Sequence, residues 1–250
     1  MSLEIKKRLA LSVSSIGTYE KCPKKYWYTY IEKPDIPKKK WDHLEFGSYV
    51  HLVLEKFHKY LIEQFLPQSE YPALMKKCME LALKEFDESI LEKDADLVRR
   101  TLQSYLDQIK KNSLPNVLFV EKPFLMEIGD YNIRGFIDRI DKVGDGHYHV
   151  VDYKTSKDPK YLTPFQLYVY SLVIKEEFSD AEKITGSYML LKHNCDYKTW
   201  EISDKDISNC KDKIAKFGNL ITTDSAWDKK PSQLCNFCDF KDLCMNNWTD

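Results

Sequence analysis

The chain has 250 residues, of which 43% are hydrophobic and 31% are charged, and its formal net charge is −1. This composition is that of a globular protein and excludes an intrinsically disordered chain. Because the charge is balanced, any contact with nucleic acid must come from local patches. Neither the basic N-terminal stretch nor any later segment has the apolar length of a signal peptide or membrane span. We therefore expect a cytoplasmic protein that makes no membrane contact.

The first half of the chain has the apolar spacing of helices. A helix opened by a serine cap is expected first, then a loop rich in Pro and Lys, and then several helices with apolar residues three and four apart. These elements are a helix over 14–31 with Ser14 or Ser15 as N-cap and a break near Pro23, the loop 33–41, and the helices between Phe46 and Lys111.

After Pro115 the period changes to the alternation that is typical of strands. Helices before a small mixed sheet, with further helices on that sheet, predict an α/β or α+β fold in one domain, 1–250. Its parts are a mainly helical region 12–113, a sheet region 115–203 and a C-terminal region 204–250. The expected elements are strands 117–128, 131–143 and 147–155, helix 164–178, strands 184–194 and 197–202, helix 204–221 and an irregular tail from Thr222.

One hairpin, residues 135–156, places acidic residues together. Asp152 and Lys154 are two apart on a strand and so share a face. A three-residue turn with Val143 opposite His147 would set Asp138 opposite Asp152 on that same face. A two-residue turn would set Asp138 on the wrong face, unless a bulge restores the register.

Two adjacent carboxylates repel each other unless a cation lies between them, and oxygen ligands suit Mg²⁺ or Mn²⁺. Lys154 beside such an ion could orient an attacking water or neutralise charge on a phosphate. In the alternative interpretation, Asp138 forms a surface ion pair with Arg139 or Arg134. The paired valines before Asp152, and a second acidic strand at hairpin distance, favour the metal site.

The hairpin resembles the PD-(D/E)XK nuclease superfamily, and in particular its RecB-like branch. Further segments resemble that branch in the family's order, although Ile137 stands where a proline is usual and Asp152 where glutamate is common. The matching segments are SVSSIGTYEKCPKKYWYTYI (12–31), FGSYVHLVLEKFHKYL (46–61), GFID (135–138), DYK (152–154), Gln166 to Tyr170, and the cysteines up to Cys244.

The resemblance implies a restriction-endonuclease-like core and a set of site residues. Four ligands would hold the metal, Lys154 would be the catalytic lysine, and a glutamine and a tyrosine four residues apart would orient the DNA backbone and the site. An acidic residue on the preceding strand could touch the metal or its water, although a surface ion pair would explain it equally well. These residues are the ligands His51, Asp138, Asp152 and the Tyr153 carbonyl, the pair Gln166 and Tyr170, and the acidic Glu121.

The tail segment CNFCDFKDLC presents Cys235, Cys238 and Cys244, whereas tetrahedral zinc and iron–sulfur sites usually need four thiolates. The resemblance implies that Cys22 is the fourth ligand, in a [4Fe–4S] cluster, with structural Zn²⁺ as the alternative. Such a site would join the two ends of the chain. The other cysteines, Cys78, Cys195 and Cys210, are expected to be packing residues.

The predicted function is hydrolysis of phosphodiester bonds by a metal-dependent DNA exonuclease acting on single-stranded or end-opened DNA, in recombination, repair or phage DNA processing. The stretch KCPKKYWYTY would contact DNA, with Lys24 and Lys25 on phosphates and its rings either stacked on bases or packed in the core. The alternatives are a CRISPR-associated nuclease that processes spacers, and a non-catalytic DNA-binding subunit of a helicase–nuclease complex. A helicase or CRISPR-type protein would then be the partner.

Overall fold

The structure is a computed structural model that describes residues 8–36, 42–86, 89–155, 160 and 162–246. The chain divides into two compact units. Unit 1 contains Met1–Lys40, Leu125–Gly135 and Ser208–Asp250, and unit 2 contains Trp41–Phe124 and Phe136–Ile207. Both ends of the chain therefore belong to unit 1, and each unit is described separately below.

Unit 1 begins with a three-residue strand and a helix capped by serine. Ser12, and not the predicted Ser14 or Ser15, is the N-cap of the first helix, where Ser12 and Ser15 form a reciprocal capping box. The predicted break at Pro23 is confirmed, since Cys22 ends one helix and caps the next. The elements are β1 (Leu9–Leu11), α1 (Val13–Lys21), α2 (Pro23–Tyr26) and the π-helix η1 (Trp27–Glu32).

The C-terminal part of unit 1 contains a long helix and two short ones, α7 (Asp204–Thr223), η4 (Gln233–Phe237) and α8 (Lys241–Asn246); the start of α7 lies in unit 2. The prediction of an irregular tail from Thr222 was therefore wrong. Gly218 of α7 is required where the helix meets Tyr131, because a Cβ there would lie 2.4 Å from the tyrosine ring. This close approach fixes α7 against the Tyr131 side chain.

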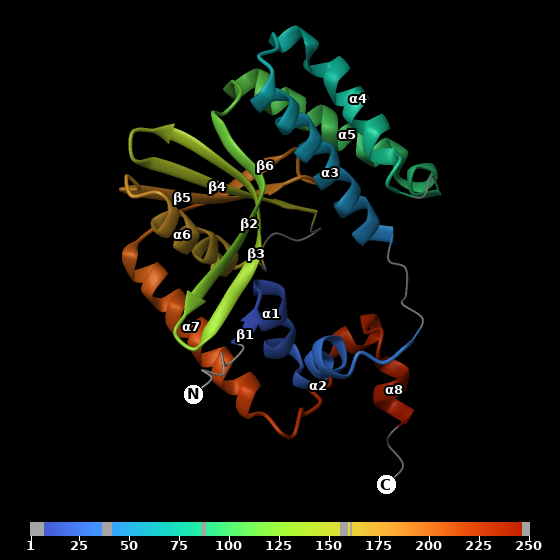
Figure 1. Ribbon diagram of the computed structural model, residues 1–250. Helices are drawn as coiled ribbons and strands as arrows, with labels where there is room; N and C mark the ends of the chain where they lie inside the picture. The colour runs from blue at the N-terminus through green and yellow to red at the C-terminus, as the bar shows by residue number, and fades with distance from the viewer. Residues whose placement is uncertain (1–7, 37–41, 87–88, 156–159, 161, 247–250) are drawn as a thin grey trace, which may run out of the picture. The chain divides into compact units, whose positions relative to one another are not determined.

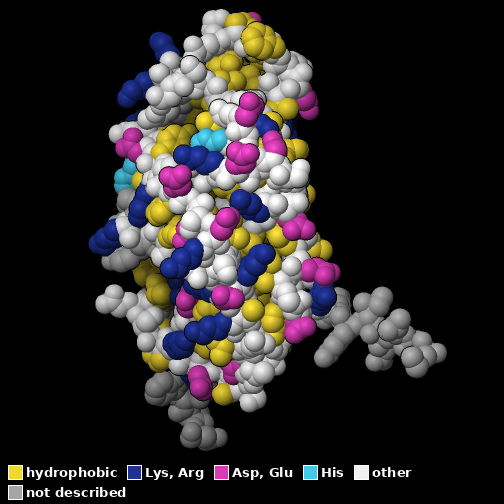
Figure 2. Space-filling model, turned by 90° about the vertical axis from the view of Figure 1, so that its left-hand side faces the viewer, with side chains coloured by type: hydrophobic (Ala, Val, Ile, Leu, Met, Phe, Trp, Pro, Cys, Tyr) yellow, Lys and Arg dark blue, Asp and Glu magenta, His cyan; other side chains and the backbone are white. Residues whose placement is uncertain are grey.

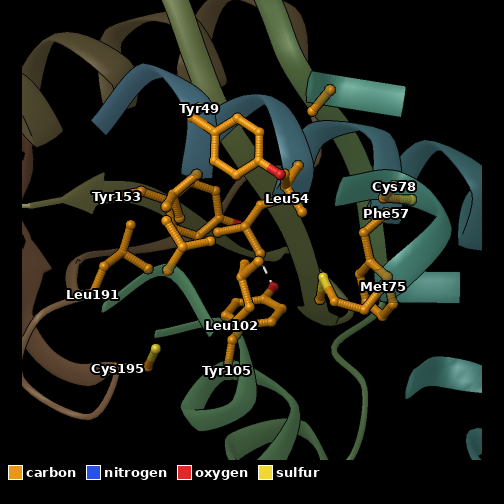
Figure 3. Close-up of a cluster of buried hydrophobic side chains, with 14 of the residues drawn as sticks. Tyr49, Leu54, Phe57, Met75, Cys78, Leu102, Tyr105, Tyr153, Leu191 and Cys195 are labelled. Carbon is orange, nitrogen blue, oxygen red and sulfur yellow. Dashed lines mark hydrogen bonds between the residues drawn. The ribbon is translucent and has the colours of Figure 1, made fainter. Parts of the chain in front are cut away.

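Unit 2 contains the helical layer predicted between Phe46 and Lys111. Figure 1 shows its three long helices lying together, and Figure 3 shows their side chains interleaved in one apolar cluster. The cluster includes Leu54, Phe57, Met75 and Leu102 from the helices and Tyr153 and Met189 from the sheet. The helices are α3 (Asp42–Glu63), η2 (Gln68–Glu70), α4 (Tyr71–Leu83) and α5 (Ser89–Asn112).

The described strands form a six-stranded mixed sheet in the order β1-β3-β4-β5-β6, with β2 paired to β3. β3–β4 and β5–β6 are antiparallel, whereas β4–β5 is parallel and is joined through helix α6, which packs on both strands. The elements are β2 (Val117–Ile128), β3 (Tyr131–Gly144), β4 (His147–Lys154), α6 (Phe165–Glu177), β5 (Lys183–Leu190) and β6 (Asp196–Ile202).

The mixed α/β fold is thereby confirmed, with helices flanking a mixed sheet. β1 was not predicted; it is only three residues long and pairs in parallel with Tyr131–Ile133. Part of the predicted loop, 37–41, and Ser156 at the end of the hairpin motif lie outside the described residues. In the part of the chain that the structure describes, no helix combines the length and the apolar character needed to cross a bilayer.

Candidate active site and cysteine pocket

The β3–β4 hairpin has the register that aligns its acidic residues. Gly144 pairs with His147, so the turn has two residues, and Val143 forms a bulge between the pairs of Lys142 and Gly144. The predicted three-residue turn is wrong, but the bulge gives the predicted parity. Arg139 pairs with Val151, and this register, continued by one residue, would set Asp138 opposite Asp152. The Asp138 carboxylate also accepts a hydrogen bond of 2.8 Å from the Tyr153 N–H.

Three side chains of unit 2 meet with the spacing of metal ligands. Each of His51, Glu121 and Asp138 offers one ligand atom within 4.8 Å of those of the other two. They come from α3, β2 and β3, so the helix and two strands must pack correctly to assemble the group. Among the described residues, this is the one set of three or more His, Cys, Asp or Glu side chains with that spacing.

Glu121 reaches this group through an unusual backbone conformation. Its φ is +47° inside β2, in the left-handed region that a residue with a Cβ rarely adopts. Such conformations cost free energy and persist where the surrounding structure requires them, often at functional sites. Lys122 and Pro123 follow it, and a proline cannot donate to the sheet ladder, which is consistent with irregular pairing at this point.

Burial controls the protonation of the three candidate ligands. Desolvation raises the pKa of Asp138 well above its usual value, and the charges of Asp152 and Glu121 raise it further. Desolvation and the charge of Glu55 are the first causes that raise the pKa of Glu121 to about 7. The pKa of His51 is lowered by burial, so its ring is favoured in the neutral form that binds metals. A divalent cation would favour the ionised form of both carboxyl groups, against the effect of their burial.

His51 is oriented by a hydrogen bond at the far side of its ring. Its Nε2 lies 2.9 Å from the Tyr153 carbonyl oxygen, so this nitrogen carries the hydrogen and donates it. Nδ1 is then the unprotonated nitrogen, and it lies 3.5 Å from Asp138 Oδ2. This is the arrangement in which a second hydrogen bond fixes the tautomer of a metal-binding histidine. The Tyr153 carbonyl, a predicted metal ligand, is accordingly the acceptor for His51.

The glycine before His51 allows α3 to approach the end of β4. A Cβ on Gly47 would lie 3.1 Å from the Thr155 Oγ1 atom, which is tighter than ordinary contact. One turn further along the helix, His51 therefore lies beside the Tyr153 peptide. The Gly-x-x-x-His spacing in the sequence thus has a direct steric meaning.

A second group forms a closed ring of polar contacts around Asp152. Tyr170 donates to Asp152 Oδ1 at 3.1 Å, and Gln166 Nε2 donates to the Tyr170 hydroxyl at 2.6 Å. Lys154 Nζ donates to Gln166 Oε1 at 2.9 Å and lies 2.5 Å from Asp152 Oδ2. The predicted common face of Gln166 and Tyr170 on helix α6 is confirmed.

Asp152 Oδ2 is buried and accepts no hydrogen bond from the described residues; its ion pair with Lys154 is its contact. A buried carboxylate oxygen needs a partner, and for this atom the Lys154 ammonium is that partner. Asp152 itself is 2% exposed and is not within the close spacing of His51, Glu121 and Asp138. The structure therefore has two groups that share the β3–β4 hairpin: His51, Glu121 and Asp138 have the spacing of metal ligands, and the ring around Asp152 holds Lys154.

The four cysteines of the predicted cluster line one hollow in unit 1, with a volume of about 80 Å³. Cys22 comes from the start of α2, and Cys235, Cys238 and Cys244 come from the tail (Figure 1). All four are free thiols, and all are half-buried. Burial is the first cause that raises the pKa of the Cys244 thiol, and the other three cysteines raise it further. By contrast, the other cysteines, Cys78, Cys195 and Cys210, are buried among core residues.

The segment predicted to contact DNA is partly core. Tyr26 is 2% exposed and stacks on Trp227, with ring centroids 6.0 Å apart. Lys24 lies over the half-buried Trp27 ring at 4.1 Å. Lys24, Lys25, Lys229, Lys230 and Lys241 all line the cysteine hollow. Over the face shown in Figure 2, positive and negative side chains are interspersed.

Sequence reasoning missed one buried polar network behind the hairpin. Arg139 is 2% exposed and pairs with the buried Asp141, and not with Asp138 as the alternative interpretation had it. It also donates to the hydroxyls of Tyr105, Tyr153 and Tyr197. A charged residue on a strand usually indicates a surface position, so the sequence carried no signal for this network.

Beside a mixed sheet, one histidine and two carboxylates have the spacing of metal ligands, and a lysine is fixed next to them. This combination is the one expected of a metal-dependent hydrolase. The model of the PD-(D/E)XK nuclease superfamily matches residues 10–245, nearly the whole chain. The chain belongs to the PD-(D/E)XK nuclease superfamily, whose nucleases use divalent metals.

Among curated proteins, the chain is similar to the Gene 69 protein of Mycobacterium phage L5, with 29% identity over 130 residues. That match covers 50% of this chain and 43% of the phage protein, so the chain spans less than half of its relative. Two solved structures are similar at low identity. SSO0001 has 17% identity and a TM-score of 0.41, covering 98% of this chain and 90% of its own. A candidate exonuclease from Eubacterium rectale has 13% identity and a TM-score of 0.46, covering 95% and 98%.

Proposed function

We propose that this protein is a Mg²⁺- or Mn²⁺-dependent deoxyribonuclease of the RecB-like branch, acting as an exonuclease on single-stranded or end-opened DNA. The observation that carries the proposal is the group of His51, Glu121 and Asp138 with the spacing of metal ligands, and the neighbouring ion pair of Asp152 with Lys154 on the same hairpin as Asp138. Superfamily membership over residues 10–245 supports it, and this span includes parts of both units, as a single nuclease domain requires.

The donor set suits a hard divalent cation, because it combines carboxylate oxygens with one imidazole nitrogen. His51, Glu121 and Asp138 would hold the ion, and Asp152, paired with Lys154, would be a further ligand on the same hairpin once the ion is bound. When bound, the ion would stabilise charge on a phosphoryl group and increase the acidity of water.

Lys154 would position the nucleophile and the phosphate. Its ammonium group is fixed by Asp152 and by Gln166, and it lies over the Tyr188 ring at 5.0 Å. A lysine fixed in this way can orient an attacking water or neutralise a phosphate oxygen without first reorganising. Gln166 and Tyr170 would act as positioning residues, since their hydrogen bonds hold Lys154 and Asp152.

The cysteine hollow would hold a [4Fe–4S] cluster, and Zn²⁺ is the alternative. Four thiols face one cavity, and backbone N–H groups of Lys25 and Ser232 lie 3.5 Å and 3.4 Å from the Cys22 and Cys235 sulfurs. Zinc would need sulfurs roughly 3.8 Å apart, given Zn–S bonds of about 2.3 Å. Among the residues that the structure describes, no three cysteine sulfurs lie within 4.8 Å of one another, which supports the larger cluster over zinc. Its role would be structural, joining α2 to the tail.

DNA would contact the lysines that surround this hollow. Five lysines concentrate positive charge on a chain whose net charge is −1, and phosphates are bound by such local clusters. The cellular setting that we propose is DNA processing in the cytoplasm, during recombination, repair or phage replication.

A time course with end-labelled DNA tests the proposal. Single-stranded and double-stranded substrates of equal length, labelled at either end, are incubated with Mn²⁺, Mg²⁺ or EDTA. We expect metal-dependent shortening from an end, faster on the single strand. Discrete internal products would contradict the exonuclease assignment, and intact DNA under every metal condition would favour a non-catalytic DNA-binding subunit.

A further inference from the structure

Tyr153 of β4 contacts two of the three candidate metal ligands through its main chain. Its N–H donates to Asp138 Oδ2 at 2.8 Å, and its carbonyl accepts from His51 Nε2 at 2.9 Å. The rings of Tyr153 and His51 also meet edge to face, with their centroids 5.6 Å apart. In the chain, Tyr153 lies between Asp152 and Lys154. The position of this one residue therefore affects both groups of the candidate active site.

The side chain of Tyr153 points to the opposite face of the sheet from those of Asp152 and Lys154, because successive side chains of a strand alternate. It is 4% exposed and packs in the apolar cluster of unit 2, where Tyr105 also lies (Figure 3). A buried hydroxyl needs a hydrogen-bond partner, and Arg139 Nη1 donates to this one at 3.2 Å. The Tyr153 ring is thereby attached to a residue of the neighbouring strand β3.

Arg139 is a rigid attachment point for this hydroxyl. Its Nε and Nη2 donate to Asp141 Oδ2 at 3.2 and 2.9 Å, and its Nη1 also donates to the Tyr105 hydroxyl at 3.0 Å. A buried charge is costly unless it is paired and hydrogen-bonded, so this guanidinium has little freedom to move. Movement of the Tyr153 ring would break a bond to a group that cannot easily follow it.

The hydrogen bond between Arg139 and Tyr153 lies behind the acidic residues. Arg139 pairs with Val151, so Tyr153, two residues further along β4, shares its face of the sheet. The preceding residues, Asp138 and Asp152, project from the other face. After burial, the charge of Asp152 is the largest cause that raises the pKa of Asp138, so these two carboxylates repel each other. The hydrogen bond joins the same two strands at the point where this repulsion would separate them.

We propose that the hydrogen bond from Arg139 to Tyr153 sets the spacing of the metal ligands, and that Tyr153 is a positioning residue of the site. The bond holds β4 against β3, so that the Tyr153 peptide keeps His51 and Asp138 in place. This role depends on the proposed metal site, although the contacts themselves exist without a bound ion. Tyr105 accepts from the same Arg139 nitrogen, but it comes from α5, and among the described residues it hydrogen-bonds to none of the three ligands.

The test compares Tyr153→Phe with Tyr105→Phe, since each removes one hydroxyl that accepts from Arg139 Nη1. Mn²⁺ binding to each folded protein is measured by calorimetry. Loss of an outer-shell partner of a metal ligand typically weakens metal binding by roughly 10–100-fold, and this hydroxyl acts one bond further out. We therefore expect Tyr153→Phe to weaken Mn²⁺ binding by about threefold to tenfold, and Tyr105→Phe by less than about twofold. An equal loss in the two variants would show a purely structural role and overturn the proposal.

A measurement in EDTA separates the positioning role from the metal site itself. Nitrogen-15 NMR of the His51 ring reports which of its nitrogens carries the hydrogen. Wild-type protein and Tyr105→Phe should show the Nε2–H form, because Nε2 donates to the Tyr153 carbonyl, and Tyr153→Phe should show both forms in exchange. A His51 spectrum that Tyr153→Phe leaves unchanged would contradict the proposal even if Mn²⁺ binds. Absence of Mn²⁺ binding to wild-type protein would instead disprove the metal site, and the His51 spectra would still decide the positioning role.

Discussion

The candidate active site and the cysteine hollow are assembled in different ways. Around Asp152, the side chains of Tyr170, Gln166 and Lys154 complete a ring of contacts between 2.5 and 3.1 Å. The four cysteines share a cavity, but their sulfurs form no group with close ligand spacing, and two of them accept only weak contacts from nearby N–H groups.

If the proposals above hold, this difference separates a site that the protein builds by itself from one that its ligand would complete. Hydrogen bonds fix the acidic site in advance, as the proposed catalysis would require. The hollow would depend on the proposed cluster to hold its segments together, because the segments that supply the cysteines are short. Mutations in the acidic site should therefore lower DNA cleavage without lowering stability, and mutations in the cysteine hollow should lower stability.

The largest effect is expected at Asp152. Asp152→Asn keeps the shape of the side chain and its contact with Tyr170 but removes the charge, so cleavage should fall by at least about 10³-fold. Single-turnover cleavage of end-labelled DNA with Mn²⁺ measures it. The control is the exposed turn residue Asp130→Asn, and bound iron should be unchanged in both. Cleavage by Asp152→Asn at the wild-type rate would disprove the assignment of the site.

The next largest effect is expected at the cysteine hollow, where a mutation should lower metal content and stability. Cys238→Ser should abolish bound iron in anaerobically purified protein and lower the thermal midpoint by at least about 5 °C, because a ligand-completed site contributes its binding energy to folding. Iron analysis and visible absorption measure the first effect, and calorimetry the second. Cys78→Ala, at a buried packing position, should keep its iron. If the wild-type protein is colourless and contains zinc, the hollow is a structural Zn²⁺ site and not an iron–sulfur cluster site.

A smaller, pH-dependent effect is expected at Glu121. Its folded pKa of about 7 lies above the ordinary value of 4.5, so its contribution to stability is full below the lower value and is lost as pH rises through the upper. In EDTA, Glu121→Gln avoids this loss, so its stability relative to wild type should increase over that interval. Denaturant unfolding at about pH 4 and about pH 8 measures it.

With Mn²⁺ present the sign should reverse, because Glu121→Gln removes a carboxylate ligand while the cation stabilises the wild-type protein. The exposed Glu63→Gln at the end of α3 is the control and should show neither effect. A stability difference independent of pH and of Mn²⁺ would mean that Glu121 is an ordinary strand residue.

The smallest effect concerns the network behind the hairpin. Tyr105→Phe removes one acceptor of Arg139, at 3.0 Å, and should lower the free energy of unfolding by about 0.5–1.5 kcal/mol. Cleavage should change by less than about threefold, since no atom of the metal group is altered. Tyr197→Phe, with a longer bond of 3.3 Å and an exposed ring, should cost less stability. A large loss of cleavage without a loss of stability would give Tyr105 a direct role in positioning the site.

The strand parity of the hairpin and the helical spacing of Gln166 and Tyr170 could be predicted, because each depends on local periodicity alone. Two features lay beyond such reasoning. The contribution of Glu121 requires a left-handed backbone in the middle of a strand, and no short pattern indicates one there.

Arg139 is the second case. Its partners Tyr105 and Tyr197 lie 34 and 58 residues away, so its burial depends on how α5 and β6 pack against β3. Strand β1 and the two short helices near the cysteines, η4 and α8, were missed because each is too short to show a periodic pattern in the sequence. Cys22 was connected with the tail through the family resemblance, and the shared hollow agrees with that grouping without testing the identity of the bound group.

The most direct test of the central claim is the position of Mn²⁺ in the protein, measured by anomalous diffraction from crystals soaked in the ion. We predict a peak bonded at roughly 2.0–2.4 Å to ligand atoms of His51, Glu121 and Asp138, and its loss in Asp138→Asn. Full occupancy at another place on the chain, with none at these three residues, would contradict the proposed metal site.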